Sequence, residues 1–181
     1  MRCAVALLLL AASSLGAQTV APARVSLELV VSAATLRQSF SFDCCGPTRT
    51  ADGVGVVLRV QRPVGRLLAA GGEAGLSVTR NVRDMRWLMA IGTIAGTGRV
   101  APWAQVGGGL VIQPGECPAD GSDPGPGCQV ALRPGGGVAA GVRWRLGGFA
   151  VGLEAGLVTS ISNGVRRFST ERYGVSVRMR M

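Results

Sequence analysis

The feature that most constrains the fold of this chain is a two-residue alternation of apolar and polar side chains that recurs in eight segments. In one of them, Val56, Leu58 and Val60 alternate with Arg59 and Gln61. Such alternation sends the two kinds of side chain to opposite faces of a β-strand. Glycine, with 28 residues in the chain, recurs within these segments and disfavours helix. The predicted strands cover residues 24–36, 54–62, 67–79, 86–92, 100–112, 138–146, 149–157 and 172–181.

The connections between these segments are short and long in turn. Pro63-Val64-Gly65, Gly96-Thr97-Gly98 and Gly147-Gly148 are short, whereas residues 37–52 and 114–128 form long connections. This order predicts antiparallel neighbours, with the short turns at one end and the long loops at the other. Turn lengths also predict which residues face each other, with a bulged three-residue loop at 162–164. The predicted opposite pairs are Trp144 and Val151, Val60 and Leu68, Leu58 and Ala70, Leu153 and Tyr173, and Glu154 and Arg172.

One face of the array is apolar, and the other carries charge among Gly, Ser and Ala. The charged members of this second face are Glu28, Arg59, Glu73, Arg86, Arg143, Glu154, Arg172 and Arg178. A soluble barrel is expected to bury its bulky apolar side chains, whereas a membrane barrel turns them to lipid. We therefore predict an all-β, eight-stranded, antiparallel up-and-down transmembrane β-barrel with a polar interior and an apolar, lipid-facing exterior. The alternative is an open sheet or sandwich with one solvated face.

Acids and bases on the same inward face are expected to pair, because an unpaired charge in a low dielectric is costly. Glu154, opposite Arg172 and diagonal to Arg143, is the expected centre of this cluster. Glu73 and Glu28 are expected to pair with further inward arginines, namely Arg59 and Arg178.

Aromatic residues are expected to mark the two ends of the apolar exterior, as in membrane barrels. Trp144 and Phe149 fall at the short-turn end, and Trp87 falls at the long-loop end. All three are therefore expected to point outward.

The N-terminus has the order of a secretory signal peptide: a basic start, an apolar run and a cleavage region of small residues. Met1-Arg2 supplies the charge, residues 4–12 form the apolar run and residues 13–17 form the cleavage region. We expect cleavage after Ala17, which makes residues 1–17 a signal peptide and residues 18–181 one barrel domain. The apolar run is too short for a membrane-spanning helix.

Four cysteines follow this segment, an even number in an exported chain, and they predict disulfides. Cys44 and Cys45 fall in the first long loop, and Cys117 and Cys128 in the third. Local closure of Cys117 with Cys128 is the favoured pairing, and bonds between the two loops are the alternative. The spacing of these cysteines fits a zinc site less well than it fits disulfides.

Composition excludes much catalytic chemistry. The chain has no His, and all 19 of its basic residues are Arg, against 10 acids. It therefore lacks an imidazole base, a His metal ligand and a Schiff-base lysine. We expect no cofactor, no metal and no enzymatic activity. Nucleic acid is not an expected partner, because the arginines are dispersed singly with few stacking aromatics.

The C-terminal segment resembles the terminal signal by which bacterial outer-membrane barrels are recognised for insertion, although it ends in Met rather than Phe. The residues that carry this resemblance are Tyr173, Gly174, Val175, Val177, Met179 and Met181. With the signal peptide and the eight alternating segments, the mature chain resembles a small outer-membrane β-barrel of the OmpA/OmpX-like type.

The resemblance implies a monomer inserted in the outer membrane, in contact with its lipid and handled by the barrel-insertion machinery during biogenesis. It also implies short periplasmic turns and longer external loops. Catalytic members of the family rely on His, which this chain lacks. The expected function is a structural or surface-interaction role with an unknown external ligand. The alternatives are a soluble periplasmic lipocalin-like barrel that binds a lipid or small hydrophobic ligand, and a narrow pore.

Overall fold

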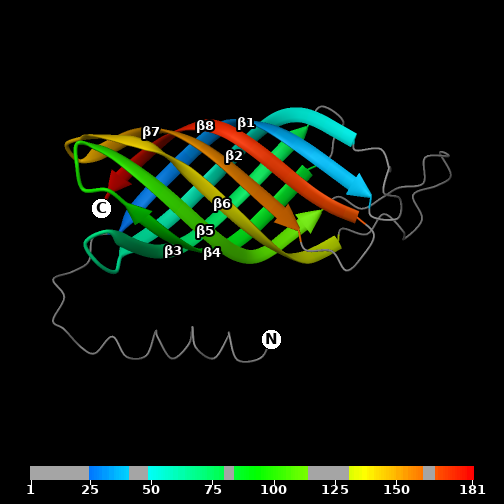
Figure 1. Cartoon of the computed structure of the whole chain (residues 1–181), viewed down its shortest axis with the longest axis horizontal. Coiled ribbons are helices and arrows are strands. Elements are labelled where there is room, and N and C mark those ends of the chain that lie inside the picture. The colour runs from blue at the N-terminus through cyan, green and yellow to red at the C-terminus, as the bar shows by residue number, and fades with distance from the viewer. Residues whose placement is uncertain (1–24, 41–48, 80–83, 114–130, 161–165) are drawn as a thin grey trace, which may run out of the picture.

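The chain forms a closed barrel of eight antiparallel strands, each paired with its neighbours in sequence and with β8 paired to β1 (Figure 1). The computed structural model describes residues 25–40, 49–79, 84–113, 131–160 and 166–181. The predicted fold class is confirmed, and most strands extend beyond their predicted bounds. The strands are β1 (Ser26–Phe40), β2 (Arg49–Pro63), β3 (Leu68–Thr79), β4 (Asp84–Ala95), β5 (Val100–Gln113), β6 (Ala131–Leu146), β7 (Phe149–Ser160) and β8 (Arg166–Arg180).

The three short connections lie at the same end of the barrel as the C-terminus (Figure 1). Gly147, in the turn between β6 and β7, has a φ of 70°. This left-handed conformation is readily adopted by glycine. At the same end the amide of Met181 donates to the carbonyl of Val25 at 2.9 Å, which ties the last residue to the start of β1.

Strand register follows the sequence prediction in part. Trp144 lies opposite Val151 as predicted. The β2–β3 pairing differs by four residues, because the connection is longer than a three-residue turn and the last pair is Pro63 with Ala69. The β7–β8 pairing differs by two residues, and its last pair is Thr159 with Ser169. The observed partners are Val60 with Gly72, Leu58 with Ala74, Leu153 with Val175, and Glu154 with Gly174.

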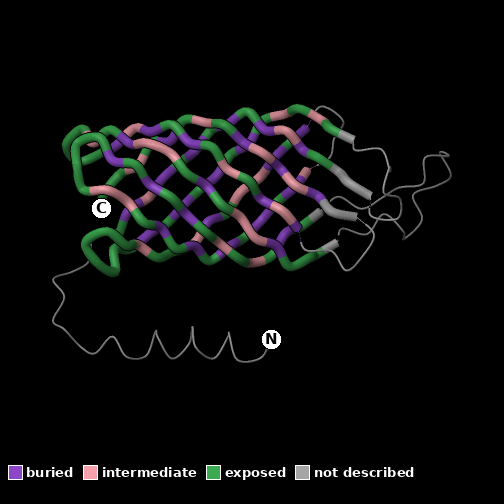
Figure 2. Tube along the Cα trace, viewed as in Figure 1, coloured by how far each residue is buried: buried purple, intermediate pink, exposed green. Residues whose placement is uncertain are grey.

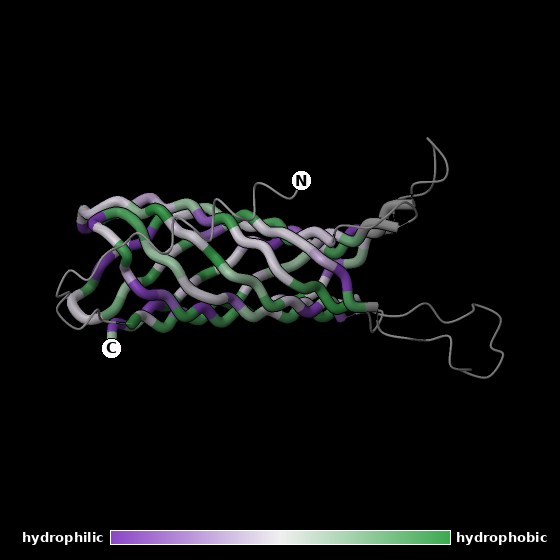
Figure 3. The backbone as a smooth tube through the Cα atoms, turned by 90° about the horizontal axis from the view of Figure 1, so that it is seen from below, coloured by the Kyte–Doolittle hydropathy of each residue, from purple (hydrophilic) through white to green (hydrophobic). Residues whose placement is uncertain are grey.

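Both register differences are even numbers, so every side chain on these strands keeps its predicted face. Buried and exposed residues alternate along the strands (Figure 2), and so do hydrophilic and hydrophobic residues (Figure 3). Every strand carries apolar side chains on its exterior, and exposed charges such as Arg37 and Arg86 lie toward the long-connection end. Trp144 and Phe149 are exposed on this exterior as predicted. Its large exposed members include Leu29, Val31, Val56, Leu58, Leu88, Val106, Val138, Leu153, Tyr173, Val175 and Val177.

Strand β4 reverses the predicted faces. Trp87 is buried inside the barrel rather than placed on an outer aromatic belt. Arg86, predicted to point inward, is exposed near the end of the strand and forms an ion pair with Asp84 at 3.4 Å. Strand β4 carries apolar residues on both faces, so alternation alone could not orient it.

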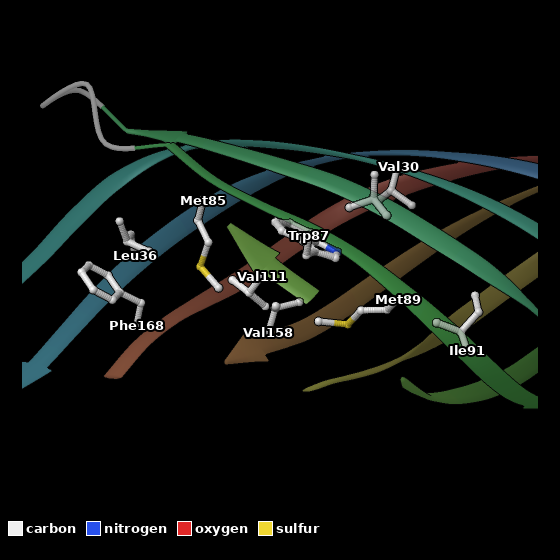
Figure 4. Close-up of a cluster of buried hydrophobic side chains, with 10 residues drawn as sticks. Val30, Leu36, Met85, Trp87, Met89, Ile91, Val111, Val158 and Phe168 are labelled. Carbon is white, nitrogen blue, oxygen red and sulfur yellow. The ribbon is translucent and has the colours of Figure 1, made fainter. Parts of the chain in front are cut away.

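An apolar cluster fills the interior from the long-connection end toward the middle of the barrel (Figure 4). It draws on side chains from six strands, which are Val30, Leu36, Val57, Met85, Trp87, Met89, Ile91, Val111, Val158 and Phe168. Met89 of this cluster lies opposite Glu73 in the β3–β4 pairing, so apolar and charged side chains meet inside the barrel. In the described part of the chain, no helix is long and apolar enough to cross a membrane.

Candidate functional site

Six charged side chains from six strands meet inside the barrel and form one ion network. None of the six is more than 5% exposed. All belong to the cluster predicted from alternation. The members of this interior network are Glu28 of β1, Arg59 of β2, Glu73 of β3, Arg143 of β6, Glu154 of β7 and Arg172 of β8.

Arg59 is the hub of the interior network. Its Nε donates to Glu73 Oε2 at 2.7 Å, and its Nη2 donates to Glu154 Oε1 at 2.8 Å. Its Nη1 donates to Glu154 Oε2 and lies 3.7 Å from Glu28 Oε2. One guanidinium therefore joins carboxylates from three strands, a use of the Arg donor fork that Lys could not reproduce.

Arg143 pairs with Glu28 rather than with its diagonal neighbour Glu154. The Nη2 of Arg143 lies 2.8 Å from both Glu28 oxygens, and its Nε lies 3.1 Å from Oε1. The guanidinium carbon also lies 4.0 Å from the centre of the Trp103 ring. The prediction that Glu154 is close to Arg143 in register is confirmed, but the partner assigned to Arg143 differs.

Arg172 completes the interior network although it does not lie opposite Glu154 in register. Its Nη2 donates to Glu73 Oε1 at 3.3 Å and lies 3.9 Å from Glu154 Oε1. Its register partner is Gly156, where a Cβ would come within 2.6 Å of Arg172 Nε. The absence of a side chain at Gly156 gives the arginine room to reach inward.

Neutral donors also hold Glu73 in place. Trp87 Nε1 donates to Glu73 Oε1 at 2.8 Å, and Gln105 Nε2 donates to Oε2 at 2.8 Å. Sequence reasoning assigned no role in the cluster to Trp87, Trp103 or Gln105. The two-residue alternation in β5 places both Trp103 and Gln105 on the inward face. The sequence pattern could therefore have identified both as interior residues.

The charges of the interior network balance, with three arginines against three glutamates. Removing six charges from water is costly, and mutual pairing is the condition under which they can be buried. Each carboxylate accepts at least two hydrogen bonds from a guanidinium in this arrangement. The network can therefore lock the walls of the barrel together, and it holds no free carboxylate to serve as a base.

Arg178, the seventh predicted member, lies outside the interior network. It is adjacent to Glu28 across the β1–β8 pairing. Its Nη2 donates instead to Ser26 Oγ at 2.6 Å, nearer the short-turn end. This position leaves its charge available to the mouth of the barrel.

The remaining predicted residues divide between the exterior and the part of the chain that is not described. On β8, Tyr173, Val175, Val177 and Met179 point outward and are exposed, as is Met181. The predicted signal peptide (1–17) and Cys44, Cys45, Cys117 and Cys128 lie outside the described residues. Among the described residues, no group of three or more His, Cys, Asp or Glu side chains is arranged to hold a metal ion.

The fold matches solved structures of small outer-membrane barrels. Neisserial surface protein A aligns with a TM-score of 0.64 at 13% identity, over 86% of this chain and 97% of that one. The N-terminal β-barrel domain of Pseudomonas aeruginosa OprF gives 0.54 at 9% identity, over 86% and 97%. The outer-membrane enzyme PagL gives 0.50 at 13% identity, over 86% and 99%.

Neither a protein-family model nor a curated protein sequence matches this chain. The likeness to these structures confirms the predicted fold type, an eight-stranded barrel of the outer-membrane kind. One of the three is an enzyme, so the fold alone does not decide whether a member is catalytic.

Proposed function

We propose that the protein is an integral β-barrel of the bacterial outer membrane with a structural or surface-interaction role and no catalytic activity. The observation that carries this proposal is the distribution of polarity, because charge lies buried inside and apolar side chains cover the outside. This is the arrangement that lipid selects and water opposes.

The exterior supports insertion in a bilayer. The strands are 12 to 16 residues long, and a tilted strand needs about 9–11 residues to cross. A water-soluble monomer rarely exposes an apolar patch larger than a few hundred Å², whereas here every strand contributes to an apolar surface. The closed barrel has no free strand edge, which favours a monomer.

The interior argues against the two alternative functions. A lipocalin-like barrel would need an apolar cavity, and here Arg59, Glu73 and Glu154 occupy the middle of the barrel. A pore would need a continuous water path. Arg59 instead bridges the walls, as expected for an eight-stranded barrel whose interior is just wide enough for side chains.

The composition and the interior network support a non-catalytic role. The three buried glutamates are engaged by guanidinium groups, and the chain contains no His. Ser77 of β3 carries a buried hydroxyl that could be considered as a nucleophile, and its Oγ accepts a 3.4 Å hydrogen bond from Thr170 Oγ1. Among the described residues it has no hydrogen bond to a base that could activate it. The protein on this proposal needs no cofactor or metal.

Biogenesis on this proposal uses residues 1–17 for export and the outward side chains of β8 for recognition by the barrel-insertion machinery. Outer-membrane lipid is then the principal partner, and nucleic acid is not one. The fold of the three solved neighbours supports this location. The external ligand, if the role is adhesion, binds at the long-loop end.

Extraction from membranes tests the proposal. Outer membranes from cells that express the full chain are washed with alkaline carbonate or urea, and the folded state is read from a shift in gel mobility on heating. An integral barrel stays in the membrane and migrates differently before and after boiling. Release of folded protein into the wash would indicate a soluble barrel, and steady single-channel currents in planar bilayers would indicate a pore.

A further inference from the structure

A cavity of about 410 Å³ opens at the short-turn end of the barrel, between the interior network and the short turns. Its basic lining residues are Arg66, Arg143, Arg145, Arg178 and Arg180, and its lining contains no carboxylate among the described residues. We call this space the arginine vestibule. Its size falls in the range of about 300–1,000 Å³ that small-molecule sites occupy.

The charge of the arginine vestibule is not balanced by the barrel. Arg143 on its floor is paired with Glu28, which belongs to the neutral interior network. The other four arginines have no ion pair with a carboxylate in the described part of the chain. Arg178 is repelled by Arg143, Arg180 and Arg145 and attracted by one carboxylate, that of Glu28, which already pairs with Arg143. A bound anion would relieve this repulsion.

The donors of the vestibule are partly fixed in advance. Arg145 is held by the carbonyls of Thr97 and Gly96, each at 2.7 Å. Arg178 is held by Ser26 Oγ at 2.6 Å. These bonds use two donors of Arg145 and one of Arg178, and a guanidinium carries five. Positioned guanidinium groups with spare donors suit the planar, bidentate recognition of phosphate.

We propose that the arginine vestibule binds a phosphate group. The group belongs either to a small soluble phosphate ester or to the headgroup of an anionic phospholipid in the adjoining leaflet. If the protein has the proposed function, the short turns and the arginine vestibule face the periplasm. Phosphate binding does not depend on that location, because it rests on the arginines alone. An uncharged apolar ligand is disfavoured because it would leave four like charges unrelieved at the mouth.

The test begins with the folded barrel in a non-ionic, phosphate-free detergent, titrated with glycerol 3-phosphate in a calorimeter. Arg178→Gln and Arg145→Gln each remove one charged donor and should weaken binding roughly tenfold or more. Arg133→Gln is the matched control, because Arg133 is exposed on β6 at the opposite end, and it should leave binding unchanged. Added salt should weaken binding by the wild-type protein.

A second arm separates the two sources of phosphate. The barrel is placed in phosphatidylcholine bilayers with or without phosphatidylglycerol, and lipids retained after detergent extraction are identified by mass spectrometry. Binding of glycerol 3-phosphate supports a soluble ligand. Retention of phosphatidylglycerol by wild type, reduced in Arg178→Gln, supports a headgroup.

Binding of neither phosphate source, or equal weakening by Arg133→Gln, would overturn the phosphate site. Gel mobility on heating reports whether each variant is folded, so a folding defect in one variant leaves the other as the test. The membrane wash described above tests insertion separately. A folded protein that washes off the membrane but binds glycerol 3-phosphate would overturn the proposed location and keep the phosphate site.

Discussion

Arg59 and Glu154 form a two-pronged ion pair across the inside of the barrel, with Nη2 to Oε1 at 2.8 Å. They lie on β2 and β7, which are separated around the barrel by β1 and β8. Strand pairing alone does not bring these two residues together. The pair therefore acts as a cross-brace between walls that share no backbone hydrogen bonds, and both charges depend on it because both are buried.

Loss of the Glu154 charge should strongly destabilise the barrel. Glu154→Gln leaves Arg59 and Arg172 with one buried carboxylate fewer, and breaking a buried pair costs about 3–5 kcal/mol. The matched control is Glu171→Gln, which breaks the exposed Arg37–Glu171 pair and should cost at most about 1 kcal/mol. Urea unfolding in detergent or lipid measures both. Equal urea midpoints for the two variants would mean that the charges of the interior network are in contact with water and are not buried inside the barrel.

A double-mutant cycle on Glu28 and Arg143 should reveal strong coupling with unequal single costs. Glu28→Met removes the carboxylate that binds Arg143, whereas after Arg143→Met the Glu28 carboxylate keeps Arg59 at 3.7 Å. Glu28→Met should therefore be the more damaging single change. The double variant should recover about 0.5–3 kcal/mol relative to the sum of the singles. Additive unfolding free energies would contradict the pairing.

Alternation allowed the sequence to predict the strands, the barrel and the face of every network member. It could not predict the partners, because partners depend on register and register depends on the exact length of each turn. Glu154 and Arg172 illustrate this limit: they are two residues out of register and still meet, since both remain inside and Gly156 leaves space. The face on which a side chain lies follows from the pattern of its own strand, whereas its partner across the interior depends on how all eight strands close into the barrel.

Strand β4 shows where alternation fails. Both of its faces are apolar, and Arg86 was the only charge within the predicted segment 86–92 that could orient it. Arg86 lies near the end of the strand, where an outward arginine can reach water and Asp84. Packing decides instead that Trp87 points inward, because Gly75 on the neighbouring strand makes room for its indole. No pattern within β4 itself contains that information.

Filling the space beside Trp87 should disrupt Glu73 indirectly. Gly75 is the cross-strand partner of Trp87, and a Cβ there would come within 2.1 Å of the ring atom Cε2. Gly75→Ala should therefore displace the ring, weaken its bond to Glu73 and cost about 1–3 kcal/mol. Gly92→Ala on β4 is the control, since a Cβ there meets no heavy atom within 4 Å. Unfolding free energies and the tryptophan emission spectrum give the readout. Similar stability of the two variants would show that the ring adapts without cost.

A charge placed on the exterior distinguishes lipid from water as the surroundings of the barrel. Val106 is 63% exposed near the middle of β5, and Leu132 is 59% exposed at the long-connection end of β6. If lipid covers the exterior, Val106→Arg should cost about 2–4 kcal/mol and Leu132→Arg no more than about 1 kcal/mol, because the penalty for arginine falls from the bilayer midplane toward the interface. Reversible urea titration of folding into phospholipid vesicles measures both values. In water the two exposed positions would be equivalent, and neither arginine would carry such a penalty. A Val106→Arg barrel as stable as wild type in vesicles would therefore contradict insertion, whereas a graded cost from middle to end is expected only if the strands cross a bilayer.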